Sequence, residues 1–264
     1  MIKKANYDQL DFARLYREQK KVSTFKTKTY IDWDKKALIS GQNMLKGNYP
    51  TDFLSRVDFS GCQSALDFGC GPGTLSLLAA PYLHEVVACD YAPNMLTFLN
   101  DNAHRQGINN IRTLQLAYED DWDAVPECDL VFASRCLELD DIQMGLKKLI
   151  SKAKQRVYLT YKVGRSFLSD DIDDLIERPI VPKPDYIYVI NILYQLGIHP
   201  KVDYIECEDK RFMAESADEL LERVRWSLGE LSCVDEQKIR TYFQTDFQHT
   251  QRIIKWAFIS FDVN

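Results

Sequence analysis

Three glycines stand close together after a short apolar run, in the stretch "SALDFGCGPGTLSLLAA". They are Gly69, Gly71 and Gly73, and Asp67 lies two residues before the first of them. A strand that ends in such a turn and leads into a helix presents backbone N–H groups near the positive end of the helix dipole. Glycine suits this place because a Cβ atom would keep a ligand away. The stretch therefore predicts a ligand-binding loop.

The charge of Asp67 favours one class of ligand over two others. A nucleoside triphosphate site needs Gly-Lys-Ser/Thr after the loop, and the sequence has none there. A dinucleotide site needs a third glycine at the position of Thr74, and the Asp67 carboxylate would repel a pyrophosphate. The same carboxylate suits S-adenosylmethionine, which carries an ammonium and a sulfonium group and no phosphate. We predict that Asp67 accepts a hydrogen bond from its amino group.

A second acidic residue, Asp90, ends the next apolar run, "EVVACD", about twenty residues after the glycines. A carboxylate at this place can accept hydrogen bonds from both ribose hydroxyls. Because a nicotinamide enzyme would have it too, Asp90 indicates an adenosine ligand without choosing among them. The alternative role is an N-cap of the following helical stretch "APNMLTFLNDNA".

These residues need a sheet to position them. Five apolar runs of four to six residues read as strands separated by helical patterns: "SALDF", "EVVACD", "IRTLQL", "DLVFAS" and "RVYLTY". Continuous apolar strands alternating with helices indicate a parallel sheet that is covered on both faces. "KVDYIECE" and "RIIKWAFISFDV" predict a sixth and a seventh strand, with two helices between them. "PDYIYVINILYQLG" is apolar nearly all round, which predicts a buried helix closed by Gly197.

The segments "LDFGCGPGTLSLLAA", "ACDYAPNMLTFLNDNA" and "CDLVFASRCLELDD" resemble, in this order, the motifs of class I S-adenosylmethionine-dependent methyltransferases. The small-molecule and quinone-type branch, like methyltransferase type 11, is the most similar. The resemblance covers residues 64–162. It implies a doubly wound, seven-stranded, Rossmann-like α/β sheet whose last strand is antiparallel. We expect an N-terminal helical cap over residues 1–60 and a methyltransferase domain over 61–264, with a helical insertion at about 212–246.

The resemblance also implies roles for individual residues. The loop would surround the methionine end of the cofactor, Asp90 would hold the ribose, and Ser134 would pass the methyl group. The family usually has an Asp-Ala pair that contacts the adenine. This chain has Leu116-Ala117 there, so we expect Ala117, with Tyr118 or Glu119, to contact the adenine instead. The full set expected at the cofactor is Asp67, Gly69, Cys70, Gly71, Gly73, Asp90, Tyr91, Met95, Ala117, Tyr118, Glu119 and Ser134. Cys70 serves there as a small filler.

Four residues are candidates for contact with the methyl acceptor. Arg135 and Tyr161 follow or end the fourth and fifth strands, where open α/β sheets bind ligands. Tyr30 and Trp33 lie in the N-terminal helices, which would close over the cofactor, although core packing explains them as well. The family often has histidine where this chain has Glu138, so no base carries over and the catalytic residues stay unassigned.

The composition narrows the function classes. The net charge of −6 argues against a general nucleic-acid binder, so we expect no DNA partner. Seven cysteines without a C-x-x-C pair indicate free thiols in a reducing cytoplasm. No apolar run is long enough to span a membrane, the basic N-terminus lacks a signal-peptide core, and no spacing indicates a metal site.

We expect methyl transfer to a small molecule with release of S-adenosylhomocysteine. An RNA or protein methyltransferase, a nicotinamide oxidoreductase and a non-catalytic S-adenosylmethionine-binding module are the alternatives. Neither the acceptor nor the oligomeric state follows from the sequence.

Overall fold

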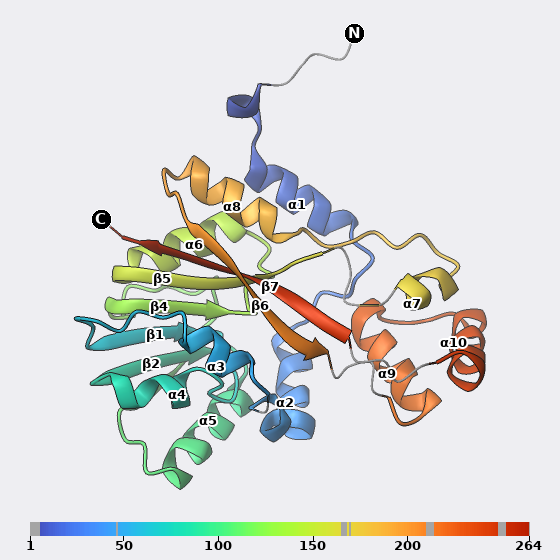
Figure 1. The fold of residues 1–264 in the computed structure, drawn as a ribbon, viewed down its shortest axis with the longest axis horizontal. Coiled ribbons are helices and arrows are strands. Elements are labelled where there is room, and N and C mark those ends of the chain that lie inside the picture. The colour runs from blue at the N-terminus through green and yellow to red at the C-terminus, as the bar shows by residue number, and fades with distance from the viewer. Residues whose placement is uncertain are drawn as a thin grey trace.

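The computed structural model describes residues 6–45, 47–164, 168, 170–209, 214–247 and 252–263. Within these residues seven strands form one sheet of order β3-β2-β1-β4-β5-β7-β6 (Figure 1). The strands are β1 Ser64–Phe68, β2 Glu85–Asp90, β3 Ile111–Gln115, β4 Cys128–Ser134, β5 Ala153–Lys162, β6 Lys201–Asp209 and β7 Arg252–Asp262. Each strand lies where the sequence predicts one, so the seven-stranded α/β sheet is confirmed.

The directions of the strands place the site. β1 to β5 pair in parallel, and β7 runs antiparallel to both β5 and β6. The expectation of an antiparallel last strand is therefore confirmed. Because parallel strands end at the same edge, the loops that follow β1, β2, β3, β4 and β5 all meet there.

Helices cover both faces of the sheet. Those before β1 are η1 Tyr7–Gln9, α1 Phe12–Val22, α2 Tyr30–Met44 and α3 Tyr49–Leu54. Those between β1 and β5 are α4 Ser76–Ala79, η2 Ala80–Tyr82, α5 Pro93–Arg105 and α6 Ile142–Ser151. Those after β5 are α7 Asp170–Leu175, α8 Tyr186–Gln195, α9 Ala217–Leu228 and α10 Cys233–Thr245.

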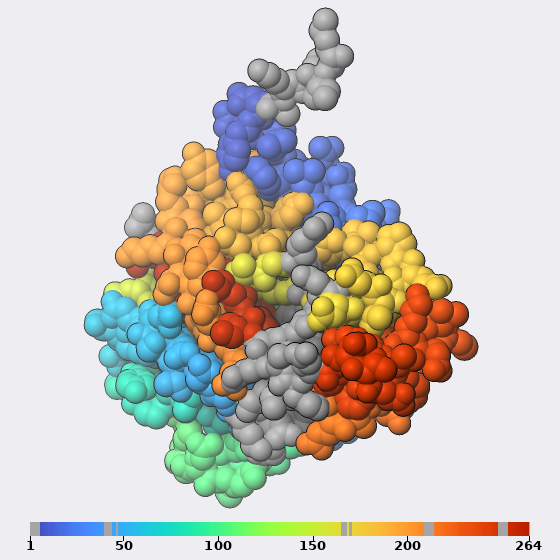
Figure 2. All heavy atoms as spheres, turned by 45° about the vertical axis from the view of Figure 1, so that its right-hand side comes forward, coloured from blue at the N-terminus to red at the C-terminus, as the bar shows by residue number. Residues whose placement is uncertain are grey.

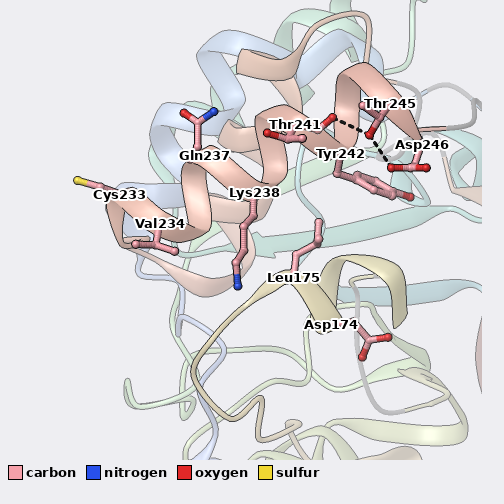
Figure 3. A pocket seen from close by; sticks show the side chains of 10 residues that line it. All are labelled: Asp174, Leu175, Cys233, Val234, Gln237, Lys238, Thr241, Tyr242, Thr245 and Asp246. Carbon is pink, nitrogen blue, oxygen red and sulfur yellow. Dashed lines mark hydrogen bonds between the residues drawn. The ribbon is translucent and has the colours of Figure 1, made fainter.

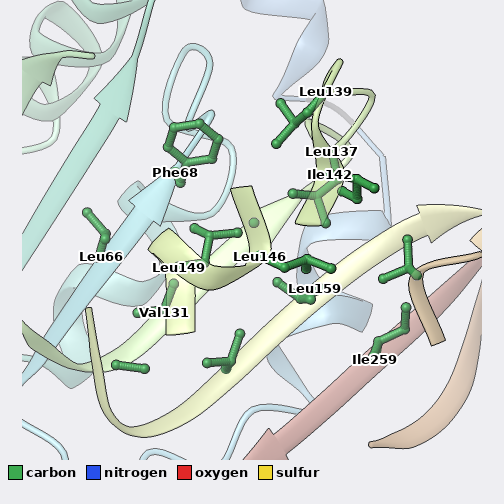
Figure 4. Packing of buried hydrophobic residues seen from close by; sticks show 14 of the residues in the cluster. Leu66, Phe68, Val131, Leu137, Leu139, Ile142, Leu146, Leu149, Leu159 and Ile259 are labelled. Carbon is green, nitrogen blue, oxygen red and sulfur yellow. The ribbon is translucent and has the colours of Figure 1, made fainter. Parts of the chain in front are cut away.

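The central strands β1, β2 and β4 are apolar nearly throughout because both sides of each are buried. In β4, Val131 and Ala133 pack in a cluster with side chains of α1, α6 and α8 (Figure 4). Leu130 and Phe132 alternate with them and pack on the opposite face with residues of α3 and α4. Hydrophobic packing on both faces of the sheet thus fixes the edge from which the loops after the parallel strands extend.

The helices of the first sixty residues lie on different parts of the sheet. α1 packs against α8 and α6, α2 against α5, and α3 against α4 and β6. The division into a cap over residues 1–60 and a domain over 61–264 stays a prediction. Of these helices, α2 bears most directly on the site, because it crosses the start of α5.

Two helices, α9 and α10, separate β6 from β7, as the sequence predicts. Together with α7 they have a hydrophobic cluster of their own, which includes Ile172, Leu221, Val224 and Ile239. They lie to the right of the sheet in Figure 1 and at the lower right of Figure 2. An open groove of about 610 Å³ runs between α7 and α10 (Figure 3), and no predicted site residue lines it.

The expectation that α8 is buried all round is wrong for one face. Val189, Ile192 and Leu193 are buried, whereas Ile187 and Tyr194 are 49 % and 52 % exposed. The helix packs on α1, α6 and β5 along one side only. Gly197 follows its end with φ 82°, as a closing glycine should.

Candidate cofactor and acceptor site

The glycine loop after β1 bends through left-handed backbone conformations. Gly69, Gly71 and Gly73 have φ values of 67°, 55° and 94°. Residues with a Cβ atom are strained at such angles, so the loop requires glycine at all three positions for its own path. This requirement holds with or without a ligand.

Only one of the three glycines leaves open space on its Cβ side. A Cβ on Gly69 would overlap the side chain of Cys136, and one on Gly73 would lie 3.0 Å from Leu77 and from Leu99. Gly71 has no atom closer than the Met95 sulfur, at 4.0 Å. The steric reason for glycine, room for a ligand, therefore fits Gly71 alone, and the placement of all three glycines at the cofactor stays a prediction. Gly69 makes room for Cys136, Gly73 for the helices behind it, and Gly71 alone opens outward.

Asp67 lies buried beneath this loop, 1 % exposed. Its Oδ2 accepts a hydrogen bond of 2.5 Å from the Ser76 hydroxyl, at the start of α4. Burial raises the pKa of Asp67 to about 7, although the bonds from Ser76 act in the opposite direction. A cation near this carboxylate would favour its ionised form.

Asp90 joins the end of β2 to the loop. Its Oδ2 accepts from the Gly71 N–H and its Oδ1 from the Ala92 N–H, both at 2.9 Å. Burial raises its pKa, and these bonds lower it in part. Because α5 begins at Pro93, with Ala92 at the N-cap position, the alternative role of Asp90 as an N-cap is wrong. Asp90 instead fixes the open turn at Gly71.

A third carboxylate, Asp34, reaches this place from α2. Its two oxygens accept from the backbone N–H and the side-chain amide of Asn94, each at 2.7 Å. Asp34 is not among the residues predicted for the site. The sequence does give one sign that such an acceptor is needed. The residue before Pro93, at the start of α5, is an alanine, whose side chain cannot cap a helix. The free N–H groups of this helix end therefore require an acceptor from another element.

Three acidic side chains lie near the loop at this corner of the molecule, and each carries a negative charge when it is ionised. No lysine or arginine pairs with Asp34, Asp67 or Asp90 in the part of the chain that the structure describes. Ionised carboxylates without a cationic partner attract a cationic group and repel a pyrophosphate. These acceptors therefore suit the cationic groups of S-adenosylmethionine, and Asp67 disfavours a dinucleotide.

The neighbours of this corner are aromatic or apolar. Tyr91 has its ring centroid 6.4 Å from that of Tyr30 of α2, which is 52 % exposed. Met95 is buried, and Trp33 packs edge-on against Trp226 of α9 at 5.5 Å. Tyr30 thus lies beside the predicted ribose and adenine region, while Trp33 joins α2 to the insertion.

The residues expected at the adenine are partly engaged with the chain itself. The Ala117 N–H donates to Asp120 at 2.7 Å, and its carbonyl accepts from the Trp122 indole at 3.0 Å. The Tyr118 hydroxyl accepts from the Asp140 N–H at 3.3 Å, whereas Glu119 is exposed. An adenine contact from Ala117 requires exchange of the Asp120 bond.

The side chain of Cys70 is buried between the loop and α5. It packs with Ala88, Leu96 and Leu99, and its thiol donates to the Gly71 carbonyl at 3.5 Å. This packing agrees with its expected part as a filler.

A hydroxyl network connects the end of β4 to its neighbours. The Tyr49 hydroxyl lies 2.7 Å from both the Ser134 and the Thr160 hydroxyl oxygens. The next residue, Arg135, donates its N–H to Thr160 at 3.0 Å, and its guanidinium carbon lies 4.2 Å from the centre of the Tyr49 ring. Ser134 and Arg135 are therefore held at the site edge, and Tyr49 and Thr160 are further residues that the sequence analysis missed.

Comparison with known proteins identifies the family. A family model described as a methyltransferase domain matches residues 65–156, which contain the loop, Asp90 and the end of β4. An uncharacterized protein of Haemophilus influenzae is 34 % identical over 264 residues, 98 % of each chain. This chain belongs to the class I S-adenosylmethionine-dependent methyltransferases. S-adenosylmethionine is its cofactor.

Solved structures share the fold of this methyltransferase. A methyltransferase structure from Bacillus halodurans is 12 % identical, with a TM-score of 0.60 over 82 % of this chain and 99 % of that one. A phosphoethanolamine N-methyltransferase of Haemonchus contortus, in complex with phosphomonomethylethanolamine and S-adenosylhomocysteine, is 19 % identical. Its TM-score is 0.54 over 97 % of this chain and 61 % of that chain.

Tyr161, expected near the acceptor, belongs mainly to the core of the methyltransferase. It is 4 % exposed, and its hydroxyl donates to that of Tyr16 at 3.2 Å. Tyr16 in turn donates to the Leu139 carbonyl at 3.1 Å. Tyr161 also lines a cavity of about 10 Å³ with Glu138 and Lys183, which is room for a single water.

Neither a metal-binding group nor a membrane-spanning helix occurs among the described residues. The described residues contain no group of three or more histidine, cysteine or acidic side chains placed to hold a metal ion. Among the same residues, no helix has both the length and the apolar character needed to cross a bilayer.

Proposed function

We propose that this methyltransferase transfers the methyl group of S-adenosylmethionine to a small-molecule acceptor and releases S-adenosylhomocysteine. The observation that carries the cofactor half of the proposal is the set of three carboxylates that lie near the glycine loop and form no ion pair among the described residues. The acceptor half is supported by the negative net charge, which disfavours a nucleic acid, and by the likeness in fold to the Haemonchus enzyme.

Each residue of the corner has a proposed task. Asp67 would accept a hydrogen bond from the amino group of the cofactor, and Asp90 would accept hydrogen bonds from the ribose hydroxyls beside Gly71. Tyr91 and Met95 would pack against the ribose or adenine, with Tyr30 closing over them from α2. Bound S-adenosylmethionine supplies a methyl group on a sulfonium, which is a good leaving group.

What the chain then contributes is mostly position. Holding two reactants in a near-attack geometry lowers a barrier by up to roughly 7–11 kcal/mol. Ser134 and Arg135, fixed by Tyr49 and Thr160, would line the path of the methyl group. We propose no general base, because an acceptor that is already nucleophilic does not need one. Seven free cysteines agree with a cytoplasmic setting.

A labelling experiment tests the proposal. The protein is incubated with methyl-labelled S-adenosylmethionine and three fractions of a cell extract: small molecules, RNA and protein. We expect label in the small-molecule fraction, and loss of that transfer in the Asp90→Asn variant. Label in RNA or protein alone would contradict a small acceptor. Cofactor binding without any transfer would favour a non-catalytic module.

A further inference from the structure

Arg135 has an unusual backbone. Among the described residues other than glycine it alone has a positive φ, 58°. A side chain in this left-handed conformation costs free energy, and it persists only where the surroundings hold it. Such strain often accompanies a function, so the contacts of this residue are informative.

Two contacts fix Arg135 at the end of β4. Its N–H donates to Thr160, and its guanidinium lies over the Tyr49 ring at 4.2 Å. The Tyr49 ring is buried, and its hydroxyl is held at 2.7 Å by Ser134 and by Thr160. The guanidinium therefore rests on a rigid floor built from α3, β4 and β5.

The position of Arg135 borders the glycine loop. Its neighbour Cys136 packs directly on Gly69 and donates its thiol to the Phe68 carbonyl at 3.1 Å. Arg135 thus lies between the loop after β1 and the end of β5. In the proposed function this is where the acceptor approaches the methyl group.

No carboxylate that the structure describes compensates the charge of Arg135. The residue is exposed, and no carboxylate in the described ranges forms an ion pair with it. By contrast, Arg156 pairs with Asp58 at 3.2 Å and Arg56 with Asp203 at 2.8 Å. Asp90, by contrast, lies at Gly71 on the loop after β1, so this edge of the sheet presents a carboxylate and a guanidinium at different places.

The guanidinium fork matches the two oxygens of a carboxylate or a phosphate. A guanidinium beside a sulfonium would also repel it unless an anion lies between or near them. We propose that the methyl acceptor carries an oxyanion, a carboxylate or a phosphate, which the guanidinium of Arg135 binds. This inference rests on the proposed function and names the chemical class of its acceptor.

The test uses inorganic phosphate and acetate as probes. Each is titrated calorimetrically into the full-length protein at constant ionic strength, with and without saturating S-adenosylhomocysteine. We expect the wild type to bind at least one of the two anions at millimolar concentration. Arg135→Gln should weaken that binding by about tenfold or more, while Arg112→Gln should not change it. Arg112 is an exposed arginine of β3 and pairs with Glu85 at 3.5 Å.

A second variant separates binding from structure. Arg135→Gly relieves the strained backbone and removes the guanidinium, so it should abolish anion binding without lowering the melting temperature. If the arginine served only to pack on Tyr49, this variant would melt earlier and the anions would bind as before. That result overturns the proposal, as does failure of both anions to bind the wild type.

The two proposals fail in different ways. Absence of S-adenosylhomocysteine binding contradicts the proposed function. The anion titration in the absence of S-adenosylhomocysteine still tests whether Arg135 binds an anion.

Discussion

At the scale of single residues, the proposed function gives the acids of the site the task of selecting the ligand. Asp90 accepts from Gly71 and Ala92 and so holds the open turn while presenting a negative charge to it. We predict that Asp90→Asn weakens the binding of S-adenosylhomocysteine by about tenfold or more, or about 1.4 kcal/mol. Isothermal calorimetry measures this change.

The matched control for that variant is Asp129→Asn. Asp129 also accepts backbone N–H groups of the sheet, those of Gln63 at 2.7 Å and Ser64 at 3.0 Å, but at the opposite edge. Its loss should leave the affinity unchanged. Equal affinity of the Asp90 variant and the wild type would remove Asp90 from the cofactor site.

Asp67 makes the stability of the free protein depend on pH. Its pKa rises from 3.8 to about 7 on folding, so the folded state holds this proton more tightly than the unfolded state does. The free energy of unfolding should therefore fall as the pH rises from about 4 to about 7. Asp67→Asn lacks this titration.

Urea unfolding at pH 5 and pH 7.5 checks the prediction. Between these two values, the wild type should lose more than about 1 kcal/mol of stability relative to Asp67→Asn. A difference between the two proteins that does not change with pH would mean that Asp67 is ionised throughout.

At the scale of elements, α2 supports the site by capping a distant helix. Asp34 satisfies the N-terminus of α5 with two hydrogen bonds to Asn94. Asp34→Ala should destabilise the protein by about 1 kcal/mol, as loss of a helix cap does. Denaturant unfolding measures the change.

The control for the cap is Asp101→Ala, an exposed acid on α5 itself, which should change stability by less than about 0.5 kcal/mol. If the two variants are equally stable, Asp34 does not cap α5.

The elements themselves were largely predictable, and the contacts between them were not. β1 to β5 follow from apolar runs, since burial on both faces leaves few polar positions in a strand such as β4. The places of Asp67 and Asp90 follow from the same pattern, because each lies in or at the end of a strand. Asp34 acts on a residue 60 positions away, and no local pattern predicts where α2 packs.

Side-chain roles at the acceptor edge were the least predictable. Tyr49, Ser134 and Thr160 come from three separate elements, so only the folded chain joins them. Tyr161 was expected near the acceptor because it lies near the end of β5, yet its side chain faces α1 and bonds to Tyr16. The alternation of a strand turns adjacent residues to opposite faces, and the sequence does not state which face holds a cavity.

At the scale of the whole molecule, substitutions in two different hydrophobic clusters should affect unfolding in different ways. Leu146 lies in the main cluster under the sheet, and Leu221 in the cluster of α7, α9 and α10; both are fully buried. Leu146→Ala should lower the global free energy of unfolding by about 2–5 kcal/mol. Leu221→Ala should mainly increase the local opening of the insertion.

Native-state hydrogen exchange distinguishes these outcomes. In Leu221→Ala we expect faster exchange in α9 and α10, with β1 and β4 protected as in the wild type. Faster exchange across the whole sheet would show that the insertion and the sheet unfold as one unit.

The central claim is that the acidic corner at Gly71 binds S-adenosylmethionine. Its most direct test is a calorimetric titration of the purified protein with S-adenosylmethionine, S-adenosylhomocysteine and NADH side by side. We predict micromolar binding of the two sulfur ligands and none of NADH, because a pyrophosphate would meet the carboxylate of Asp67. Binding of NADH with no binding of either sulfur ligand would contradict the account.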